Sequence, residues 1–206
     1  MEKILGKVTC FITRIKNNKV ELLLIQHPNA GIQIPAGTVE ANEAFHQAAL
    51  REAMEETGLK EFVSCGKIGK QEQILDGKYI IFDKAKIYSR PDRASLQWAE
   101  IRRGITVLHE RSQGNFVQIS YKVGDKFPEP NYITYQITGW TEESNLASKV
   151  TRQFYHLQSS SQVDEWEIET DNHHFKLFLS PLDNLPQIVS PQNEWVDYLL
   201  NEIDNL

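Results

Sequence analysis

The residues best suited to chemistry in this chain are acidic side chains that follow Gly37. Glu43 stands six positions after this glycine, and Glu52, Glu55 and Glu56 come later in the same segment. At about 100° per residue, the last three glutamates share one side of a helix. Carboxylates are hard oxygen ligands of the kind that Mg²⁺ prefers, and Mn²⁺ can substitute. The pattern therefore predicts a metal site suited to binding phosphate esters.

An alternative is that these glutamates form an ordinary solvated helix face. However, they continue the stripe formed by Phe45, Ala48 and Ala49, which is the apolar side of the predicted helix. Buried charge is costly unless it is paired or bound to a metal. Anions at a helix C-terminus and like charges three or four residues apart are also unfavourable. Bound divalent cations would reverse each of these effects, so the functional interpretation is favoured.

Residues 37–59, GTVEANEAFHQAALREAMEETGL, resemble the signature of the Nudix hydrolases. That signature is Gly, five residues, Glu, seven residues and then REUxEExGU, where U is a bulky apolar residue. The match holds at each specified position, with the small Ala53 at the first U. So many specified positions make this signal far more specific than a lone glycine motif.

The resemblance implies a strand, loop and helix within an α/β/α sandwich that has a mixed sheet. It also implies Mg²⁺-dependent hydrolysis of a nucleoside diphosphate linked to another moiety X, giving a nucleoside monophosphate and phospho-X. The family pattern assigns metal binding to the Gly37 carbonyl and to Glu52, Glu55 and Glu56. Arg51 is expected to orient carboxylates. Glu43 is expected either to reach a metal or to favour the helix N-terminus.

The general base is open between two positions, because some relatives use a glutamate of this signature and others a glutamate on a distant loop. The loop candidates are Glu165, Glu167 and Glu169, in a segment expected to precede the last strand. Alternatively, these three are surface charges around a packed Trp166.

Three further residues are candidates for substrate binding. His27 lies just before the loop that leads to Gly37, although a structural role is the alternative. Arg90 and Arg93 belong to a group of five arginines between positions 90 and 111. Arginine binds phosphate in a bidentate manner, so one or two of these arginines could bind the phosphates of the substrate. The alternative is that they are solvent-exposed surface charges.

The elements expected around the acidic segment alternate between strands and helices. Asn42 is the predicted N-cap and Gly58 the predicted C′ residue of a helix over residues 43–57. The other predicted helices cover residues 94–103 and 192–203. Strands are expected over residues 7–15, 20–27, 62–75, 78–89, 105–110, 115–123, 132–140 and 175–179.

The chain is interpreted as a single domain over residues 1–206. Its core is assigned to residues 1–83 and 150–206, and residues 84–149 form a β-rich insertion of about 66 residues. Aromatic side chains of this insertion could build a homodimer contact, which is frequent in the family that the signature resembles.

Composition favours a cytoplasmic enzyme with a small-molecule, nucleotide-type substrate. The two cysteines, Cys10 and Cys65, are too few for a disulfide framework or a zinc site. The sequence shows no membrane-spanning run and no signal peptide. A net charge of −6 argues against binding duplex nucleic acid. A nucleotide-binding regulatory domain without turnover and a diphosphate-ester isomerase are the alternative functions.

Overall fold

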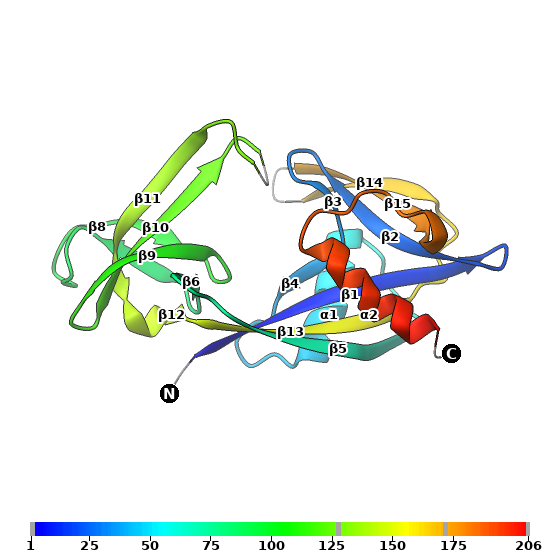
Figure 1. The fold of residues 1–206 in the computed structure, drawn as a ribbon, viewed down its shortest axis with the longest axis horizontal. Helices are drawn as coiled ribbons and strands as arrows, with labels where there is room; N and C mark the ends of the chain where they lie inside the picture. Colours follow the sequence, from blue (N-terminus) through cyan, green and yellow to red (C-terminus); the bar gives the residue numbers. More distant parts are fainter. Residues whose placement is uncertain (1–2, 127–128, 171–172, 205–206) are drawn as a thin grey trace. The chain divides into compact units, whose positions relative to one another are not determined.

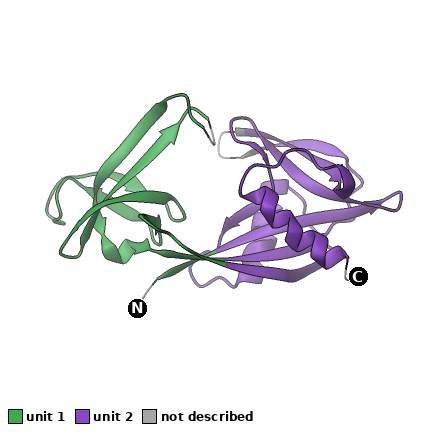
Figure 2. Cartoon of the chain, in the orientation of Figure 1, with its two compact units in different colours: residues 1–6, 72–151 green, residues 7–71, 152–206 purple. Residues whose placement is uncertain are grey.

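The computed structural model describes residues 3–126, 129–170 and 173–204, which form two compact units (Figure 2). Unit 1 comprises Met1–Gly6 and Glu72–Thr151, and unit 2 comprises Lys7–Gln71 and Arg152–Leu206. The chain passes between the units within strands β1 (Ile4–Lys16), β5 (Ser64–Ile74) and β13 (Lys149–Gln158). The predicted acidic segment lies entirely in unit 2.

The sheet of unit 2 is apolar on both faces, and each face is covered by one helix. Along β1, Cys10 and Ile12 pack with α1 (Phe45–Thr57), whereas Phe11 packs with α2 (Gln192–Ile203). Successive side chains of a strand point to opposite faces, so the two helices lie on opposite sides of the sheet (Figure 1). The predicted α/β/α sandwich is therefore confirmed.

The strands of this sheet run in the order β14-β15-β2-β1-β13-β5, and two short strands pair beside this path. β4 pairs with β1 in antiparallel register, with Gly37 opposite Val8 and Ala36 opposite Thr9. This pairing holds the glycine of the acidic segment against the centre of the sheet. The remaining strands are β2 (Lys19–His27), β3 (Gly31–Gln33), β4 (Ala36–Thr38), β14 (Glu165–Thr170) and β15 (His173–Pro181).

Helix α1 begins two residues later than the sequence predicts. The predicted N-cap, Asn42, has φ 62° and belongs to the preceding turn, whereas Ala44 is the N-cap. The amide N–H of Ala44 donates to the Gln47 side chain at 3.1 Å, which satisfies a backbone group at the helix start. Gly58 ends the helix with φ 70°, as predicted for a left-handed C-terminal residue.

Unit 1 is built around a second sheet, with strands in the order β12-β6-β9-β10-β11-β7-β8. Its core contains buried aliphatic side chains from several of these strands, including Ile81, Ile87 and Ile119. It includes the whole of residues 84–149. The strands are β6 (Lys78–Ile81), β7 (Ala85–Tyr88), β8 (Gln97–Ile101), β9 (Thr106–Gln113), β10 (Phe116–Gly124), β11 (Ile133–Glu142) and β12 (Leu146–Ala147).

The helix predicted over residues 94–103 was wrong, because this segment contains strand β8. Strand β8 pairs with β7, and Ile101 is buried at the end of the strand while Glu100 is exposed. The single strand predicted over residues 78–89 is divided into β6 and β7. No helix in the described ranges has the length and apolar character needed to cross a membrane.

Candidate active site

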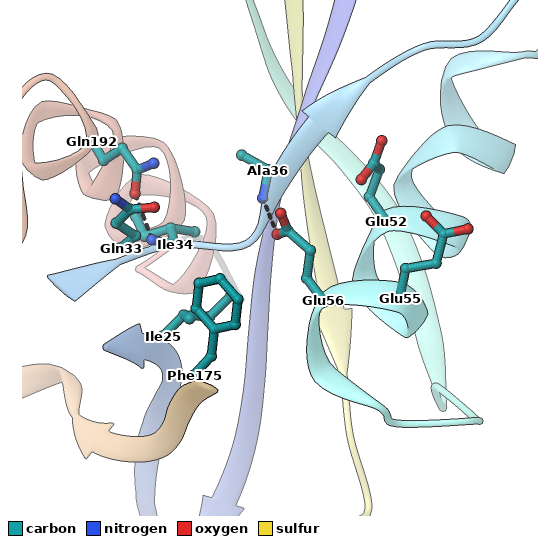
Figure 3. Close-up of a pocket in the computed structure, with 9 residues that line it drawn as sticks. All are labelled: Ile25, Gln33, Ile34, Ala36, Glu52, Glu55, Glu56, Phe175 and Gln192. Carbon is teal, nitrogen blue, oxygen red and sulfur yellow. Dashed lines mark hydrogen bonds between the residues drawn. The ribbon is translucent and has the colours of Figure 1, made fainter. Parts of the chain in front are cut away.

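A cleft of about 230 Å³ opens in unit 2 beside helix α1 (Figure 3). Glu52, Glu55 and Glu56 line one side of it, all from the second half of α1. The other side is formed by residues of the sheet and by the first residue of α2. The lining residues from outside α1 are Ile25, Gln33, Ile34, Ala36, Phe175 and Gln192.

Glu56 is the most deeply buried carboxylate of this cleft. Its Oε2 accepts a hydrogen bond from the amide N–H of Ala36 at 2.8 Å. Burial raises the pKa of Glu56 to about 8, and the nearby charges of Glu52 and Glu55 act in the same direction. The Ala36 amide lowers the pKa but does not outweigh the burial. A negative charge at this position therefore needs a cation nearby.

The Glu52 carboxyl group occupies the space beside Gly37 in which any other residue at position 37 would have its Cβ atom. A Cβ atom at Gly37 would lie 1.8 Å from the Glu52 carboxyl carbon. The Thr38 amide donates to Glu52 Oε1 at 3.1 Å. Burial raises the pKa of Glu52, against the opposing effect of its hydrogen bond with Arg51. The glycine thus provides the room in which this carboxylate lies beside the backbone of β4.

Arg51 connects the carboxylates of this segment to one another. Its guanidinium donates two hydrogen bonds to Glu43, at 2.8 and 2.9 Å. Nη1 also donates to Glu52 at 2.9 Å and to Glu55 at 3.0 Å. Hydrogen bonds to these partners, above all Glu43, raise the pKa of Arg51. Arg51 therefore holds the carboxylates in position while keeping its charge.

Glu43 lies in the turn before α1 and not in the helix, so a helical wheel does not give the direction of its side chain. The hydrogen bonds from Arg51 lower the pKa of Glu43, and the Glu40 amide also donates to its carboxylate at 2.8 Å. Glu43 does not line the cleft. Its geometry is that of a partner for Arg51.

The three carboxylates of the cleft fit a divalent cation by their chemistry. The Glu52 side chain is 13% exposed and that of Glu55 is 60% exposed, so the set extends from the sheet to solvent. In the described residues, no three His, Cys, Asp or Glu side chains are arranged as a preformed metal cluster. Hard oxygen donors of this kind suit Mg²⁺ and Mn²⁺.

Glu165, Glu167 and Glu169 lie on strand β14 rather than on a loop. Trp166 and Ile168 alternate with them and pack in the apolar cluster that contains α1. Because neighbouring side chains on a strand point to opposite faces, the three glutamates point away from the α1 side. All three are exposed, and none lines the cleft. This geometry matches the alternative interpretation, in which the three glutamates are surface charges around a packed Trp166.

We expect simultaneous replacement of Glu165, Glu167 and Glu169 by glutamine to leave turnover within about threefold of wild type. Surface substitutions away from a site usually change free energies by no more than about 0.5 kcal/mol. Initial rates at saturating substrate and metal would check this expectation. A loss of turnover of 100-fold or more would assign the general base to one of these three glutamates.

The three predicted substrate-binding residues are not part of the cleft lining. His27 contacts Phe175 edge to face, with ring centroids 5.1 Å apart, so it borders the cleft through that ring. Arg90 and Arg93 belong to unit 1, where Arg93 forms an ion pair with Glu142. In this structure the Arg93 guanidinium already has a carboxylate partner.

Gln33, Phe175 and Gln192 are cleft residues that the sequence did not indicate. Gln33 ends strand β3, Phe175 lies on β15, and Gln192 is the first residue of α2. Only Gln33 lies near Gly37 in the sequence, where the run IQIPAG gave no chemical signal. Pairing of β15 with β2 and packing of α2 on the sheet bring the other two to the cleft.

We expect Gly37→Ala to reduce turnover at least tenfold while changing the thermal midpoint by only a few degrees. The added methyl group would displace the Glu52 carboxyl group, which is the free end of a flexible side chain. No backbone needs to move, so the fold is preserved. Differential scanning fluorimetry and steady-state kinetics on the same preparation would separate the two effects. A loss of turnover accompanied by a large fall in the thermal midpoint would contradict this interpretation.

Comparisons with known proteins agree with this fold and this segment. Residues 6–88 match the family model described as NUDIX domain, and this range contains all of residues 37–59. The structure is similar to that of the NUDIX domain of Shewanella oneidensis NrtR complexed with ADP ribose. The TM-score is 0.50 at 11% identity, covering 98% of this chain and 90% of that chain.

A Caenorhabditis elegans Ap4A hydrolase in a binary complex is also similar, with a TM-score of 0.47 at 12% identity. The alignment covers 98% of this chain and 100% of that one. No curated protein sequence matches the chain significantly. Residues 6–88 are therefore identified as a NUDIX domain that carries the complete acidic signature, within a chain whose sandwich fold is similar to that of a NUDIX domain of known structure.

Proposed function

We propose that this protein is a divalent-metal-dependent pyrophosphohydrolase. It cleaves a nucleoside diphosphate linked to a moiety X into a nucleoside monophosphate and phospho-X, by attack of water on phosphorus. The observation that carries this proposal is the set of three glutamates on one side of the cleft, two of them with raised pKa values. Such a set is unfavourable for folding alone and favourable beside cations.

Glu52, Glu55 and Glu56 are the residues that would hold Mg²⁺, or Mn²⁺ in its place, with the Gly37 carbonyl as a further ligand. The cation, when bound, supplies charge neutralisation for the phosphates and a bound water of lowered pKa. Arg51 keeps Glu52 and Glu55 oriented through its hydrogen bonds. The Ala36 amide keeps Glu56 directed into the cleft.

The general base is assigned to a carboxylate of the cleft. Among the described residues, Glu52, Glu55 and Glu56 are the carboxylates that line it. The glutamates of β14 point away from the α1 side, so the proposal places the base on α1. A base has to lie within hydrogen-bond reach of the attacking water, and position is the first requirement for this role.

Incubation of the purified full chain with Mg²⁺ and a panel of nucleotides tests the proposal. ADP-ribose belongs in the panel, because it is bound in a NUDIX domain of similar fold, and Ap4A represents the dinucleoside polyphosphates. Nucleoside triphosphates and capped RNA ends are included as further candidates. Release of a nucleoside monophosphate and phospho-X, abolished by EDTA, is the expected result.

Two other outcomes of this experiment have clear meanings. Nucleotide binding without any product would favour a regulatory domain. An isomerised diphosphate ester would favour an isomerase, for which Cys10 and Cys65 are the available thiols. A homodimer and a cytoplasmic location are further parts of the proposal, and both rest on the sequence.

A further inference from the structure

The cleft beside α1 lies between an acidic wall, formed by Glu52, Glu55 and Glu56, and a facing wall formed by the sheet and the start of α2 (Figure 3). Helix α1 ends at Thr57, directly after the last of these glutamates. The final carbonyl groups of a helix have no partner within the helix. A contact that holds this final turn therefore also sets where Glu55 and Glu56 lie.

Strand β14 supplies a hydrogen-bond donor to this end of the helix. The indole Nε1–H of Trp166 donates to the Thr57 carbonyl oxygen at 2.8 Å, across 109 positions of the sequence. Thr57 is fully buried, so water does not replace this donor. A buried carbonyl group left without a partner is unfavourable. The contact with Trp166 therefore favours one position of the last helical turn.

This donor is uncharged, which is important beside the acidic wall. The negative end of a helix dipole is usually complemented by lysine, arginine or histidine. Helix α1, which is described over its whole length, has no basic residue in its last turn. A fixed positive charge there would compete with a bound cation for Glu56. An indole N–H only donates and carries no charge, so Trp166 holds the helix end and leaves this carboxylate to the metal.

The same strand connects the end of α1 with the facing wall. Strand β14 pairs with β15, and this pairing places Ile168 opposite Phe175, which lines the cleft. Ile168 also lies against the helix end, because its Cγ2 atom is 3.6 Å from the position that a Cβ atom would take at Gly58. Through Trp166 and Ile168, the strand pair that presents Phe175 to the cleft is joined to the end of the acidic helix.

We propose that Trp166 is a positioning residue for the metal-binding carboxylates. Its hydrogen bond to the Thr57 carbonyl fixes the last turn of α1 relative to the facing wall, and with it Glu55 and Glu56. Trp166 does not line the cleft, so it acts through the helix backbone and not by contact with a cation or a substrate. The inference rests on the proposed function for the metal that these carboxylates bind.

Mn²⁺ binding to the full chain, measured by isothermal titration calorimetry, tests this role without turnover. Trp166→Phe keeps an aromatic ring in the apolar cluster around α1 and removes the N–H group. We expect it to weaken Mn²⁺ binding about 10-fold, the lower end of the range for partners that orient metal ligands. The titration is made well below the thermal midpoint of the variant, where the protein is folded. A side chain that served only packing would lower the midpoint and leave the affinity of the folded protein unchanged.

The matched control is Trp195→Phe, which removes the same atoms on the other face of the sheet. Trp195 lies on α2 and is buried in the cluster that contains this helix. This variant is expected to lose stability while its Mn²⁺ affinity stays within about twofold of wild type. The proposal is overturned if folded Trp166→Phe binds Mn²⁺ as tightly as wild type. It is also overturned if the two variants weaken Mn²⁺ binding equally.

Amide hydrogen exchange of the metal-free protein in EDTA tests the contact itself. The Gly58 amide donates to the Met54 carbonyl oxygen in the last turn. In Trp166→Phe its exchange is expected to be faster by about 2- to 10-fold, the scale of losing one hydrogen bond. The Ala48 amide, near the start of the helix, is expected to keep its wild-type rate. Unchanged exchange at Gly58 overturns the proposal. A wild type that binds no Mn²⁺ contradicts the proposed function, and the exchange rates then decide the role of Trp166 by themselves.

Discussion

Replacement of Glu56 by glutamine is expected to lower turnover by at least about 100-fold, the scale of losing one principal electrostatic group in an active site. Glutamine keeps the size of the side chain, and its oxygen can still accept the hydrogen bond from the Ala36 amide. The fold is therefore preserved while the negative charge next to the proposed cations is lost. Steady-state kinetics at saturating Mg²⁺, with thermal unfolding of the same sample, measures both properties.

Glu61→Gln is the matched control for this variant. Glu61 is exposed, follows closely in the sequence and does not line the cleft. Its replacement is expected to leave turnover unchanged. Near-normal turnover of the Glu56→Gln enzyme would remove Glu56 from the catalytic group, whatever the control shows. Titration with Mn²⁺ would then show whether Glu52 and Glu55 bind metal without it.

The metal-free protein is expected to lose stability as the pH rises from about 5 to 8. Burial raises the pKa of Glu56 from its ordinary value of 4.5 to about 8. Within this window the folded state keeps a proton that the unfolded state releases. The contribution of Glu56 is therefore complete below pH 4.5 and lost once the pH exceeds 8. At about 1.4 kcal/mol per unit of pKa difference, the loss is of the order of 2–4 kcal/mol.

Urea unfolding of wild type and Glu56→Gln in EDTA, at several pH values, isolates this effect. His156 acts in the opposite direction below pH 6.5, because burial lowers its pKa, and it is present in both proteins. The difference between the two stability curves should therefore follow Glu56. Added Mg²⁺ is expected to restore wild-type stability at pH 8, since it binds the ionised form. Parallel curves for the two proteins would show that Glu56 does not titrate in this range.

The sequence predicted the arrangement of the glutamates on α1 better than the structure immediately around the helix. The spacing of Glu52, Glu55 and Glu56 placed them on one side of a helix, and all three line the cleft. The three side chains differ in exposure, because a helical wheel drawn from the sequence does not show where the edge of the sheet lies. Asn42 was wrong as the N-cap, since its side chain type suits both a cap and the left-handed turn that it occupies.

Long-range contacts account for the other differences between the predicted and the observed structure. Residues 97–101 lie in a segment whose composition also suits a helix, but antiparallel pairing with β7 makes them a strand. The strand that contains Glu165, Glu167 and Glu169 exists because it pairs with β15. Phe175 and Gln192 reach the cleft only through such pairing and packing. No local pattern around either residue carries that information.

The two walls of the cleft come from different parts of the chain, and this separation has a consequence for how the protein can change. The acidic wall is a single helix, on which Glu52 and Glu55 share Arg51 and therefore constrain one another. The facing wall gathers residues from strands β2, β3, β4 and β15 and from the start of α2. Selectivity could therefore drift, or be redesigned, by exchanging single side chains there without disturbing the three glutamates of α1.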